Sequence, residues 1–374
     1  MQNKITHFIG SIQDGGAETL VKEYSLLIDQ SRFDTSIIII RKNCNTANDR
    51  ILSESGIKII PIFKSNYLPI KIIQKLNYWW YIPYRLNKII RSQNTDILHI
   101  HLTLLHYVDK VSKKLKNTKL FYTCHSEPKV LLSGARMYEY KAAKHLITEN
   151  ELRMIALHDD MRQEINEMFG INNTVVIRNG IDFDRFRNIS ETRDQVRNNL
   201  SIPQEAFVIG HVGRFHEVKN HAFLIDVFSE ICRQRDDAFL LLVGDGPLRT
   251  SVENKLNSIG LQGKYLILSH RSDIPELMRA MDVFVFPSLY EGLGIALIEA
   301  QVSGLRCIAS DTIPEEAFKT ESAVPMSLDS PASEWCRVIL DDSIKGVAHG
   351  NIEDYDMNKE IKRLEKLYLG ELDG

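Results

Sequence analysis

The sequence has few of the features that mark a membrane-spanning, disulfide-bonded or nucleic-acid-binding protein. Its five cysteines lie far apart and form no Cys-x-x-Cys pair, so neither a disulfide framework nor a zinc site is predicted. Cys124 and Cys307 stand in apolar runs and are expected to be buried free thiols of a reducing compartment. No apolar run approaches the length needed to cross a bilayer. The formal net charge of −3 gives no overall attraction to nucleic acid or to anionic lipid.

A secretory signal is also lacking, because the apolar run at 5–12 is short and interrupted by polar residues. We therefore expect a cytoplasmic protein. A chain of 374 residues is too long for one ordinary core and suits two domains. We place these domains at 1–180 and 181–350, followed by a helical segment at 351–374. The Asn179-Gly180 turn marks the boundary between the two domains.

Short β-branched or apolar runs alternate with helical stretches along the whole chain. This alternation predicts an α/β fold with doubly wound parallel sheets, covered by helices on both faces. The expected strands of the first domain are 4–10, 35–40, 57–63, 97–102, 120–125, 154–157 and 174–177. Those of the second domain are 207–213, 238–244, 265–269, 283–286 and 307–310.

The stretch 287–304 has the pattern of a turn that opens a helix. The turn contains Gly292 and Gly294, and apolar residues then recur at helical spacing. Such a turn presents free backbone N–H groups and the positive end of a helix dipole, which predicts an anion site with phosphate as the usual occupant. Glu291 precedes the helix and Glu299 lies within it, so both can flank one ligand. The alternative is an ordinary helix start with a capping acid and a solvated Glu299.

Two basic residues follow the first strand of the second domain. Arg214 comes directly after the run at 207–213, and Lys219 stands five residues later at a helix start. A guanidinium can form two parallel hydrogen bonds with a phosphate, and an ammonium acts as a point charge, so the pair suits a diphosphate. The alternative is that both are ordinary surface charges.

Histidines stand at the ends of two neighbouring strands of the first domain. His99 and His101 alternate within one strand and therefore project from the same face, while His125 ends the next strand. A His-x-His pair suggests a metal, but no third ligand lies at a recognisable spacing. We predict no metal site, and core packing or helix capping remains the alternative role for each histidine.

Residues 55–95 contain no acidic side chain, and lysine and arginine are interleaved there with tryptophan and tyrosine. Basic and aromatic side chains together suit a membrane interface. We therefore predict peripheral contact with the inner face of the membrane through residues 63–91. The alternative is an amphipathic helix that buries its aromatic side chains and leaves its lysines in water. No other feature favours nucleic acid, and we predict no such partner.

The phrase Pro-Ser-Leu-Tyr-Glu-Gly-Leu-Gly-Ile-Ala-Leu-Ile-Glu-Ala at 287–300 resembles the signature of the retaining GT-B glycosyltransferases of family four. Gly-Arg at 213–214 with Lys-Asn at 219–220 resembles the family's diphosphate-binding pair, and 179–186 resembles its interdomain linker. The likeness covers nearly the whole chain and is greatest to the branch that builds bacterial capsules and exopolysaccharides. It implies two Rossmann-like domains that face each other across a cleft, and a last helix that crosses back to the first domain.

The resemblance also implies roles for individual residues. In the family, the histidine that matches His125 points at the transferred sugar, and Arg271 would border the nucleotide base. The implied catalytic residues are His125, Glu291, Arg214 and Lys219. The implied donor-binding residues are Gly15, Gly16, Arg214, Lys219, Arg271, Glu291, Gly292, Leu293, Gly294, Ile295 and Glu299.

We therefore predict a retaining enzyme of the hexosyltransferase type. It would move a sugar from a nucleotide-diphosphate sugar, with UDP as the first choice, to a glycan or an undecaprenyl-diphosphate-linked acceptor. The two cations would do a metal's electrostatic work, so no metal cofactor is predicted. Arg306 stands where the family more often has proline, and the family more often has Phe or Pro near Leu293 and Gly294, which leaves the donor open. The rival hypotheses are a GT-B nucleotide-sugar epimerase that needs no acceptor and a non-catalytic nucleotide-sugar binder.

Overall fold

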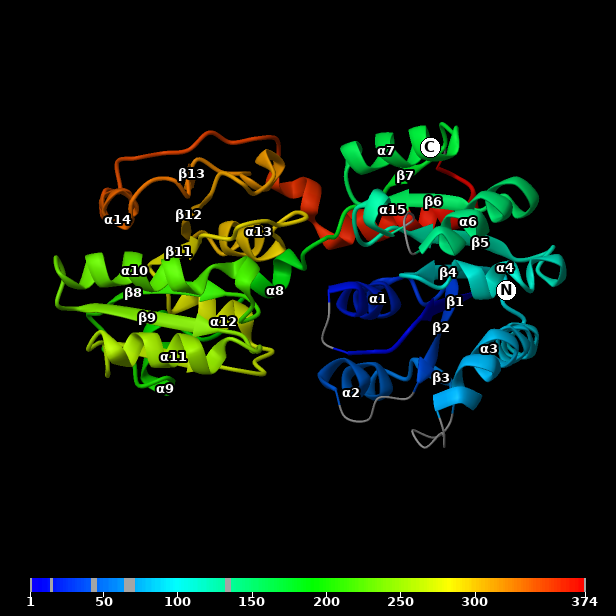
Figure 1. Cartoon of the computed structure of the whole chain (residues 1–374), viewed down its shortest axis with the longest axis horizontal. Coiled ribbons are helices and arrows are strands. Elements are labelled where there is room, and N and C mark those ends of the chain that lie inside the picture. The colour runs from blue at the N-terminus through cyan, green and yellow to red at the C-terminus, as the bar shows by residue number, and fades with distance from the viewer. Residues whose placement is uncertain (1, 14–15, 42–45, 64–70, 132–135, 373–374) are drawn as a thin grey trace. The chain divides into compact units, whose positions relative to one another are not determined.

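The structure, a computed structural model, describes residues 2–13, 16–41, 46–63, 71–131 and 136–372 (Figure 1). The chain divides into two compact units. The first unit combines Met1–Gly180 with Met357–Gly374, and the second unit is Ile181–Asp356. The C-terminal segment thus belongs to the same compact unit as the N-terminal half of the chain.

The first unit is built on a seven-stranded parallel sheet in the order β3-β2-β1-β4-β5-β6-β7. The strand order reverses between β1 and β4, which is where doubly wound sheets bind ligands beyond the carboxyl ends of their strands. The strands are β1 (Asn3–Ile9), β2 (Phe33–Arg41), β3 (Lys58–Phe63), β4 (Ile97–His101), β5 (Lys119–Thr123), β6 (Arg153–Ala156) and β7 (Val175–Val176). The helices are α1 (Gly16–Leu27), α2 (Ala47–Glu54), α3 (Lys71–Gln93), α4 (Leu105–Asp109), α5 (Pro128–Leu131), α6 (Met137–Asn150), α7 (Asp159–Phe169) and α15 (Met357–Leu369), with a 3-10 turn at Ser112–Lys114.

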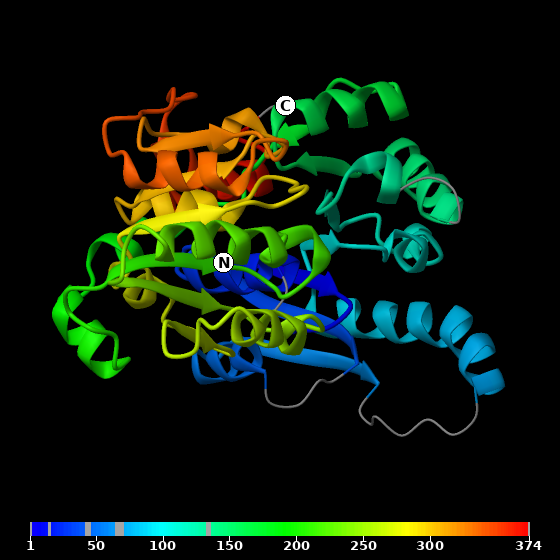
Figure 2. The same cartoon turned by 60° about the vertical axis from the view of Figure 1, so that its left-hand side comes forward.

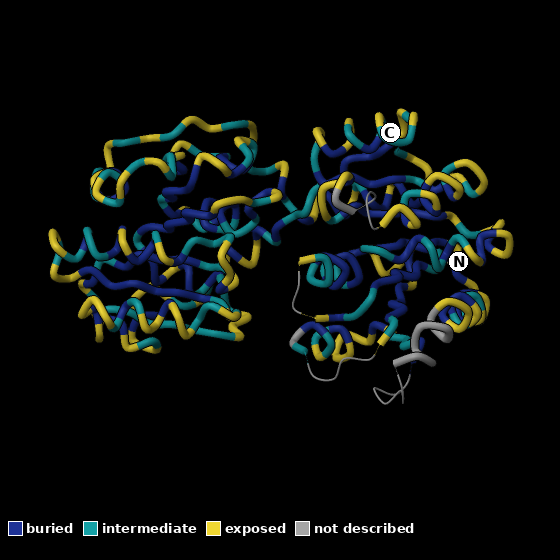
Figure 3. The backbone as a smooth tube through the Cα atoms, in the orientation of Figure 1, coloured by how far each residue is buried: buried dark blue, intermediate teal, exposed yellow. Residues whose placement is uncertain are grey.

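Helices cover both faces of this sheet, so its strands are buried on both sides (Figure 3). On one face, Ile5 and Phe121 pack in a single cluster with Tyr24 of α1 and Tyr368 of α15. On the other face, the cluster around Leu98 includes residues of α3, α4, α6 and α7. Near-continuous apolar strands of this kind are typical of parallel sheets.

The second unit has a six-stranded parallel sheet in the order β10-β9-β8-β11-β12-β13, again covered on both faces (Figure 2). Here the strand order reverses between β8 and β11. The strands are β8 (Phe207–Val212), β9 (Ala238–Val243), β10 (Tyr265–Leu268), β11 (Val283–Phe286), β12 (Arg306–Ser310) and β13 (Ala323–Met326). The helices are α8 (Phe183–Arg187), α9 (Arg193–Asn199), α10 (His221–Cys232), α11 (Arg249–Ser258), α12 (Ile274–Arg279), α13 (Ile295–Val302) and α14 (Ala332–Leu340), with 3-10 turns η3 (Glu217–Lys219), η4 (Glu315–Ala317) and η5 (Ile352–Tyr355).

The predicted fold class of two parallel-sheet α/β domains is confirmed. Two elements differ from the sequence prediction. The structure has an additional edge strand, β13, which contains Pro325. Proline cannot donate to the sheet and argues against a central strand, so the local sequence does not predict a strand there. The helical segment expected at 351–374 is divided into η5 and α15. Cys124 and Cys307 are buried free thiols, as predicted.

The helix α3 is amphipathic, but its buried face is aliphatic and not aromatic. Its aliphatic side chains, such as Ile82 and Leu86, are fully buried. Its described aromatic side chains are instead exposed, with 48% of Trp79, 73% of Trp80 and 63% of Tyr84 accessible. A buried aromatic face is therefore wrong for these residues. Among the described residues, no helix is long and apolar enough to span a membrane.

Candidate active site

The carboxyl ends of β8 and β11 meet at one edge of the second sheet, because the two strands are parallel neighbours. Arg214 follows β8 by two residues, Lys219 ends η3, and Glu291 lies in the turn after β11. The two loops are joined by a hydrogen bond from the Leu289 amide to the Val218 carbonyl at 2.8 Å. The strand-order reversal therefore places both cations and Glu291 in loops that leave the sheet at the same edge.

Lys219 and Glu291 form an ion pair at this edge. The Nζ atom of Lys219 lies 2.5 Å from Oε1 of Glu291, and the two side chains are only 19% and 13% exposed. The same Nζ atom lies 4.6 Å from the ring centre of Phe286, the last residue of β11. Burial weakens competition from water, so this pair is stronger than a typical surface ion pair.

Arg214, in contrast, is exposed, and its guanidinium has no hydrogen-bond or ion-pair partner within the described part of the chain. Its loop is held by the neighbouring turn after β9. The amide of Phe215 donates to the carbonyl of Asp245 at 2.9 Å. Gly244 has a φ of +154°, and a Cβ atom there would lie 2.0 Å from the carbonyl oxygen of Gly213. The Gly-Asp-Gly turn therefore requires glycine so that it can support the backbone beside Arg214.

The helix α13 begins at Ile295, after Gly294 in the left-handed conformation with a φ of +80°. No side chain caps this helix, and the amides of Ile295 and Ala296 have no backbone acceptor among the described residues. Leu293 is buried, whereas Gly292 is exposed with open space around it. Unpaired amides at a helix start form a site for an anion.

Glu299 lies in the middle of α13 and retains only part of its surface accessible. Burial raises the pKa of its carboxyl to about 7, and the positive charge of Arg185 opposes that rise. Arg185 lies on α8 and also donates a hydrogen bond to the carbonyl of Ser272, in the loop after β10. A carboxyl with a pKa near neutrality at the edge of an anion site is a candidate ligand-binding group.

Arg271 is placed by the structure in the loop after β10, where it pairs with Asp273 through a bond of 2.7 Å from Nε and a second bond from its guanidinium. This pairing raises the pKa of Arg271 and lowers that of Asp273. β10 is the edge strand, and two strands separate it from β11. Arg271 therefore lies to one side of the loops that carry Lys219 and Glu291. Its guanidinium is partly engaged before any ligand binds.

The other predicted site residues lie in the first unit. His125 follows β5 and is partly exposed, and its Nε2 atom lies 2.9 Å from Nδ1 of His101. Gly16 begins α1 and has open space where a side chain would stand. Gly15 lies outside the described residues. A third histidine, His7, which sequence reasoning missed, bonds to His101 at 3.1 Å.

These histidines belong to one buried face at the strand-order reversal of the first sheet. His7 on β1 is the register partner of His99 on β4, so the two rings project from the same face together with that of His101. One nitrogen from each of these three residues lies within 4.8 Å of the others. His7 is therefore a third histidine close to His99 and His101 in the fold, although it is distant from them along the chain. His99 already bonds to Thr123 at 2.7 Å and to Tyr368 at 2.6 Å.

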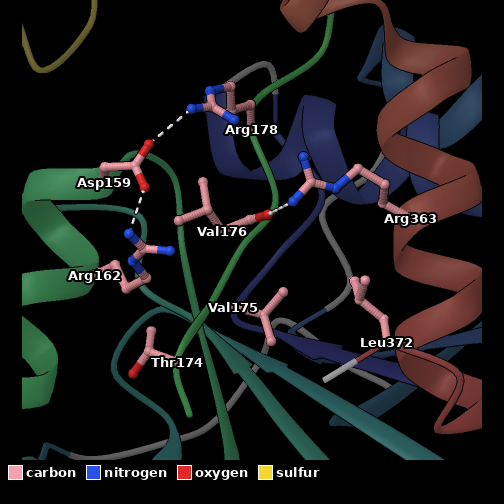
Figure 4. A pocket seen from close by; sticks show the side chains of 8 residues that line it. All are labelled: Asp159, Arg162, Thr174, Val175, Val176, Arg178, Arg363 and Leu372. Carbon is pink, nitrogen blue, oxygen red and sulfur yellow. Dashed lines mark hydrogen bonds and ion pairs between the residues drawn. The ribbon is translucent and has the colours of Figure 1, made fainter. Parts of the chain in front are cut away.

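A pocket elsewhere on the first unit contains none of the predicted residues (Figure 4). Asp159 stands there between two arginines and forms ion pairs of 2.9 Å with both Arg162 and Arg178. Arg363 donates to the carbonyl of Val176 at 3.0 Å. Each arginine of this pocket therefore already has a hydrogen-bond or ion-pair partner within the described part of the chain.

Comparison with known proteins shows the family of this chain. Residues 14–185 match the model of Glycosyltransferase Family 4, and residues 192–318 match that of Glycosyl transferases group 1. The putative glycosyltransferase EpsF of Bacillus subtilis is 31% identical over 90% of this chain and 87% of its own length. The chain belongs to glycosyltransferase family 4. It is therefore a glycosyltransferase with the GT-B fold.

Two other similar proteins share less sequence identity with this chain. The UDP-Gal:alpha-D-GlcNAc-diphosphoundecaprenol alpha-1,3-galactosyltransferase of Escherichia coli is 24% identical over 98% of this chain and 96% of its own length. Among solved structures, HepE of Anabaena in complex with UDP and glucose superposes with a TM-score of 0.76 at 18% identity. It covers 99% of this chain and 100% of its own. This structural likeness establishes the fold of the family.

Arg306, one of the departures from the usual family 4 sequence, lies away from the candidate site. It is the first residue of β12, at the opposite edge of the sheet from the carboxyl ends. Its guanidinium donates to the carbonyls of Val338 and Ile339 near the end of α14, at 2.7 and 3.0 Å. A cation satisfies the free carbonyls of a helix end and its negative dipole. Arg306 therefore has a structural role.

Proposed function

We propose that this glycosyltransferase transfers a sugar from UDP to a lipid-linked glycan acceptor, with retention of the anomeric configuration, in the synthesis of a bacterial surface polysaccharide. The observation that carries the proposal is the grouping of Arg214, Lys219 and the uncapped start of α13 in the loops at one edge of the second sheet. Two relatives of this chain support its finer parts. The capsular polysaccharide biosynthesis glycosyltransferase CapH of Staphylococcus aureus supports the polysaccharide, and the diphosphoundecaprenol galactosyltransferase supports UDP and the lipid carrier.

The diphosphate of the donor would bind in this group. Negative charge grows on the leaving diphosphate as the glycosidic bond breaks, so donors and cations fixed in advance stabilise the transition state more than the ground state. Arg214, exposed and unpaired among the described residues, is free to form bidentate hydrogen bonds with a phosphate. The amides at the start of α13 would bind a second phosphate oxygen.

Lys219 would change partner when the donor binds. In the structure its charge is matched by Glu291 at 2.5 Å, which avoids leaving a partly buried ammonium unpaired. An arriving phosphate would attract Lys219 and release the carboxylate of Glu291. That carboxylate could then accept hydrogen bonds from the hydroxyls of the donor sugar. The ion pair therefore couples diphosphate binding to the positioning of the sugar.

Glu299 would bind the ribose of the nucleotide. Acids at the edge of nucleotide sites accept hydrogen bonds from ribose hydroxyls, and Glu299 must be ionised to accept at both oxygens. Arg185 favours the ionised form. Arg271 would then border the base, from the loop to which Arg185 is also bonded.

The acceptor would reach the enzyme from the membrane surface. The first unit has an exposed apolar surface that is mostly aromatic. It is made of Trp79, Trp80 and Tyr84 on α3 and of Met137 and Tyr138 on α6. Trp79 and Tyr138 flank His106 of α4, with ring centres 6.1 and 4.9 Å from it. Lys110 lies over the ring of Trp79 at 3.3 Å. Aromatic rings with adjacent cations suit the headgroup region of an anionic bilayer.

Sedimentation with vesicles containing phosphatidylglycerol tests this part. Replacing Trp79 and Trp80 with serine should reduce the bound fraction several-fold, because burial of these rings supplies much of the interfacial energy. Ile259→Ser, which removes an exposed apolar residue of the second unit, is the matched control and should leave binding unchanged. Equal vesicle binding by the double variant and the wild type would contradict the membrane assignment.

The main proposal is tested by combining donor binding with product analysis. Thermal unfolding across a panel of nucleotides and sugar nucleotides should show the largest stabilisation with UDP compounds, because a ligand that binds only the folded state raises the melting temperature. With a preferred donor and a diphospholipid-linked acceptor, NMR of the product should show the donor's anomeric configuration. Activity should survive EDTA, since the cations would serve the diphosphate. An inverted product or a strict requirement for Mg²⁺ or Mn²⁺ would overturn that part, and epimerisation of the donor alone would identify an epimerase instead.

A further inference from the structure

Three histidines of the first unit form an unbroken chain of hydrogen bonds. Nδ1 of His7 lies 3.1 Å from Nε2 of His101, and Nδ1 of His101 lies 2.9 Å from Nε2 of His125. His7 and His101 are fully buried, whereas His125 is partly exposed. The chain therefore runs from the interior of the sheet, across β1 and β4, to the open end of β5.

The rings of this chain are neutral at physiological pH. Burial lowers the pKa of His7 to about 3 and that of His125 to about 4. The pKa of His101 also lies well below its ordinary value, first through burial and then through the neighbouring imidazoles. A neutral imidazole has one N–H group and one bare nitrogen. His101, which takes part in both links, must therefore donate at one and accept at the other, so the two hydrogens point in the same direction along the chain.

The inner end of the chain decides that direction. The Nε2 atom of His7 is buried and has no hydrogen-bond partner among the described residues. If the hydrogens pointed inward, this atom would be an N–H group without an acceptor, and buried N–H groups without acceptors are rare in folded proteins. If the hydrogens point outward, the same atom is an unprotonated nitrogen and lacks only a donor to its lone pair. The outward arrangement is therefore favoured, and it leaves the remaining proton of His125 on Nδ1.

We propose that His7 and His101 are positioning residues that hold His125 as its Nδ1–H tautomer, so that His125 offers an N–H donor at the open edge of the first sheet. The Nδ1 atom of His125 has no partner in the described part of the chain, and an oxygen atom of a neutral sugar suits it as acceptor. This inference rests on the proposed function, because the sugar would come from the donor. It adds to that function the tautomer in which the imidazole of His125 would donate a hydrogen bond to the sugar.

His99 provides a matched control for the chain. It lies on β4 two residues before His101 and is equally buried. Its nitrogens bond to Thr123 and Tyr368 instead, so it takes no part in the hydrogen bonds that lead to His125. Replacing either histidine with leucine removes a buried imidazole from the same strand and face, but only the change at position 101 breaks the chain.

The tautomer of His125 can be measured directly by ¹⁵N NMR of the full chain labelled on its histidine rings, with the signal assigned by comparison with a His125→Gln sample. In the wild type we expect a proton on Nδ1 and a bare Nε2. In His101→Leu this preference should be lost. It should be retained in His101→Gln, whose amide can accept from His7 and donate to His125, and in His99→Leu. A wild-type His125 that carries its proton on Nε2 would overturn the inference without any variant.

Kinetics supply the second readout. His101→Leu should lower kcat/KM for the sugar nucleotide about 10- to 100-fold, by analogy with the loss of groups that orient metal-binding histidines, and His101→Gln should restore most of it. UDP affinity, measured by calorimetry, should not change in either variant, because UDP is assigned to the second unit. Failure of the wild type to bind UDP would count against the proposed function. Intact UDP binding with equal losses of kcat/KM in His101→Leu and His99→Leu would count against the histidine chain.

Discussion

At the strand-order reversal of the first sheet lie neutral imidazoles, whereas at the reversal of the second sheet lie two cations and a carboxylate. Both sheets have the same parallel topology, so their carboxyl edges offer the same backbone geometry. What differs is burial and charge. His7, His99 and His101 are fully enclosed, whereas Arg214 is open to solvent and Lys219 is only partly covered.

This difference assigns different ligand chemistry to equivalent places in the two units. Burial of the first set lowers the pKa of each histidine and keeps it uncharged, which suits hydrogen bonds to a neutral sugar. The second set keeps its positive charge available for a diphosphate. On the proposed function, one fold would thus supply two binding edges, and the side chains beyond the strands would determine what each edge binds.

The largest expected effect comes from removing the cations of the second edge. Lys219→Ala or Arg214→Ala should lower kcat about 100-fold or more, as loss of a fixed donor to a developing anion does in other enzymes. Both should also weaken UDP binding. Steady-state kinetics and calorimetry measure the two effects. Arg235→Ala is the matched control, since Arg235 precedes β9 at the opposite edge and pairs with Asp237; a similar loss there would contradict the assignment.

Glu291→Gln should separate binding from turnover. Without the carboxylate, Lys219 no longer has to leave an ion-pair partner, so UDP should bind about fivefold more tightly, which corresponds to about 1 kcal/mol for one such pair. Turnover should fall, because the sugar hydroxyls lose their acceptor. Calorimetry measures the affinity of the variant for UDP, and the rate of sugar transfer measures its turnover. Weaker binding of UDP by this variant would show that Lys219 and Glu291 do not exchange partners.

Glu299 gives a pH dependence with a defined sign. Its folded-state pKa is about 7, above the ordinary value of 4.5, so the folded state retains a proton that the unfolded chain has lost between these values. Stability relative to Glu299→Gln should therefore be highest below pH 4.5 and fall as the pH rises to about 7, by at most about 3 kcal/mol. Urea unfolding of both proteins at pH 5 and pH 8 measures this.

Donor binding should respond to Glu299 in the opposite direction. If the ionised carboxylate accepts from the ribose, the affinity for UDP should rise more steeply between pH 6 and pH 8 in the wild type than in Glu299→Gln, where only the terminal phosphate of UDP, with a second pKa of about 6, still titrates. A parallel pH dependence in the two proteins would remove Glu299 from the ribose site.

The smallest effect on activity is expected at Arg306. Arg306→Ala leaves carbonyls near the end of α14 without their donor and should cost about 2 kcal/mol of stability, the range for hydrogen bonds to a charged group. The KM for the sugar nucleotide should not change, because the residue lies at the amino edge of β12. A changed donor preference would show that this departure from the family affects the site after all.

Much of the second edge could be predicted from the sequence because its residues are close together along the chain. The start of α13 followed from Gly294 and the apolar spacing after it. Arg214 and Lys219 followed from their positions after one strand. What the local pattern could not show was that Lys219 would be paired with Glu291, 72 residues away, or that Arg185 on α8 would act on the charge of Glu299.

The first edge was harder to predict because its contacts join distant segments. His99 and His101 were visible as a pair on one strand, but His7 is 94 residues from His101. Only the parallel pairing of β1 with β4 brings them together. The sequence signal of His7, a single histidine that alternates with apolar residues in a strand, is too common to identify a functional residue. The exposure of the aromatic residues of α3 likewise depended on which side of the helix meets the sheet, and aliphatic residues take that side.

The most direct test of the proposed diphosphate site is a crystal structure of the protein with UDP. We expect the diphosphate to lie against the guanidinium of Arg214, the ammonium of Lys219 and the first amides of α13, with the ribose at Glu299. UDP bound elsewhere, with the ion pair between Lys219 and Glu291 intact and no phosphate near Arg214, would contradict it.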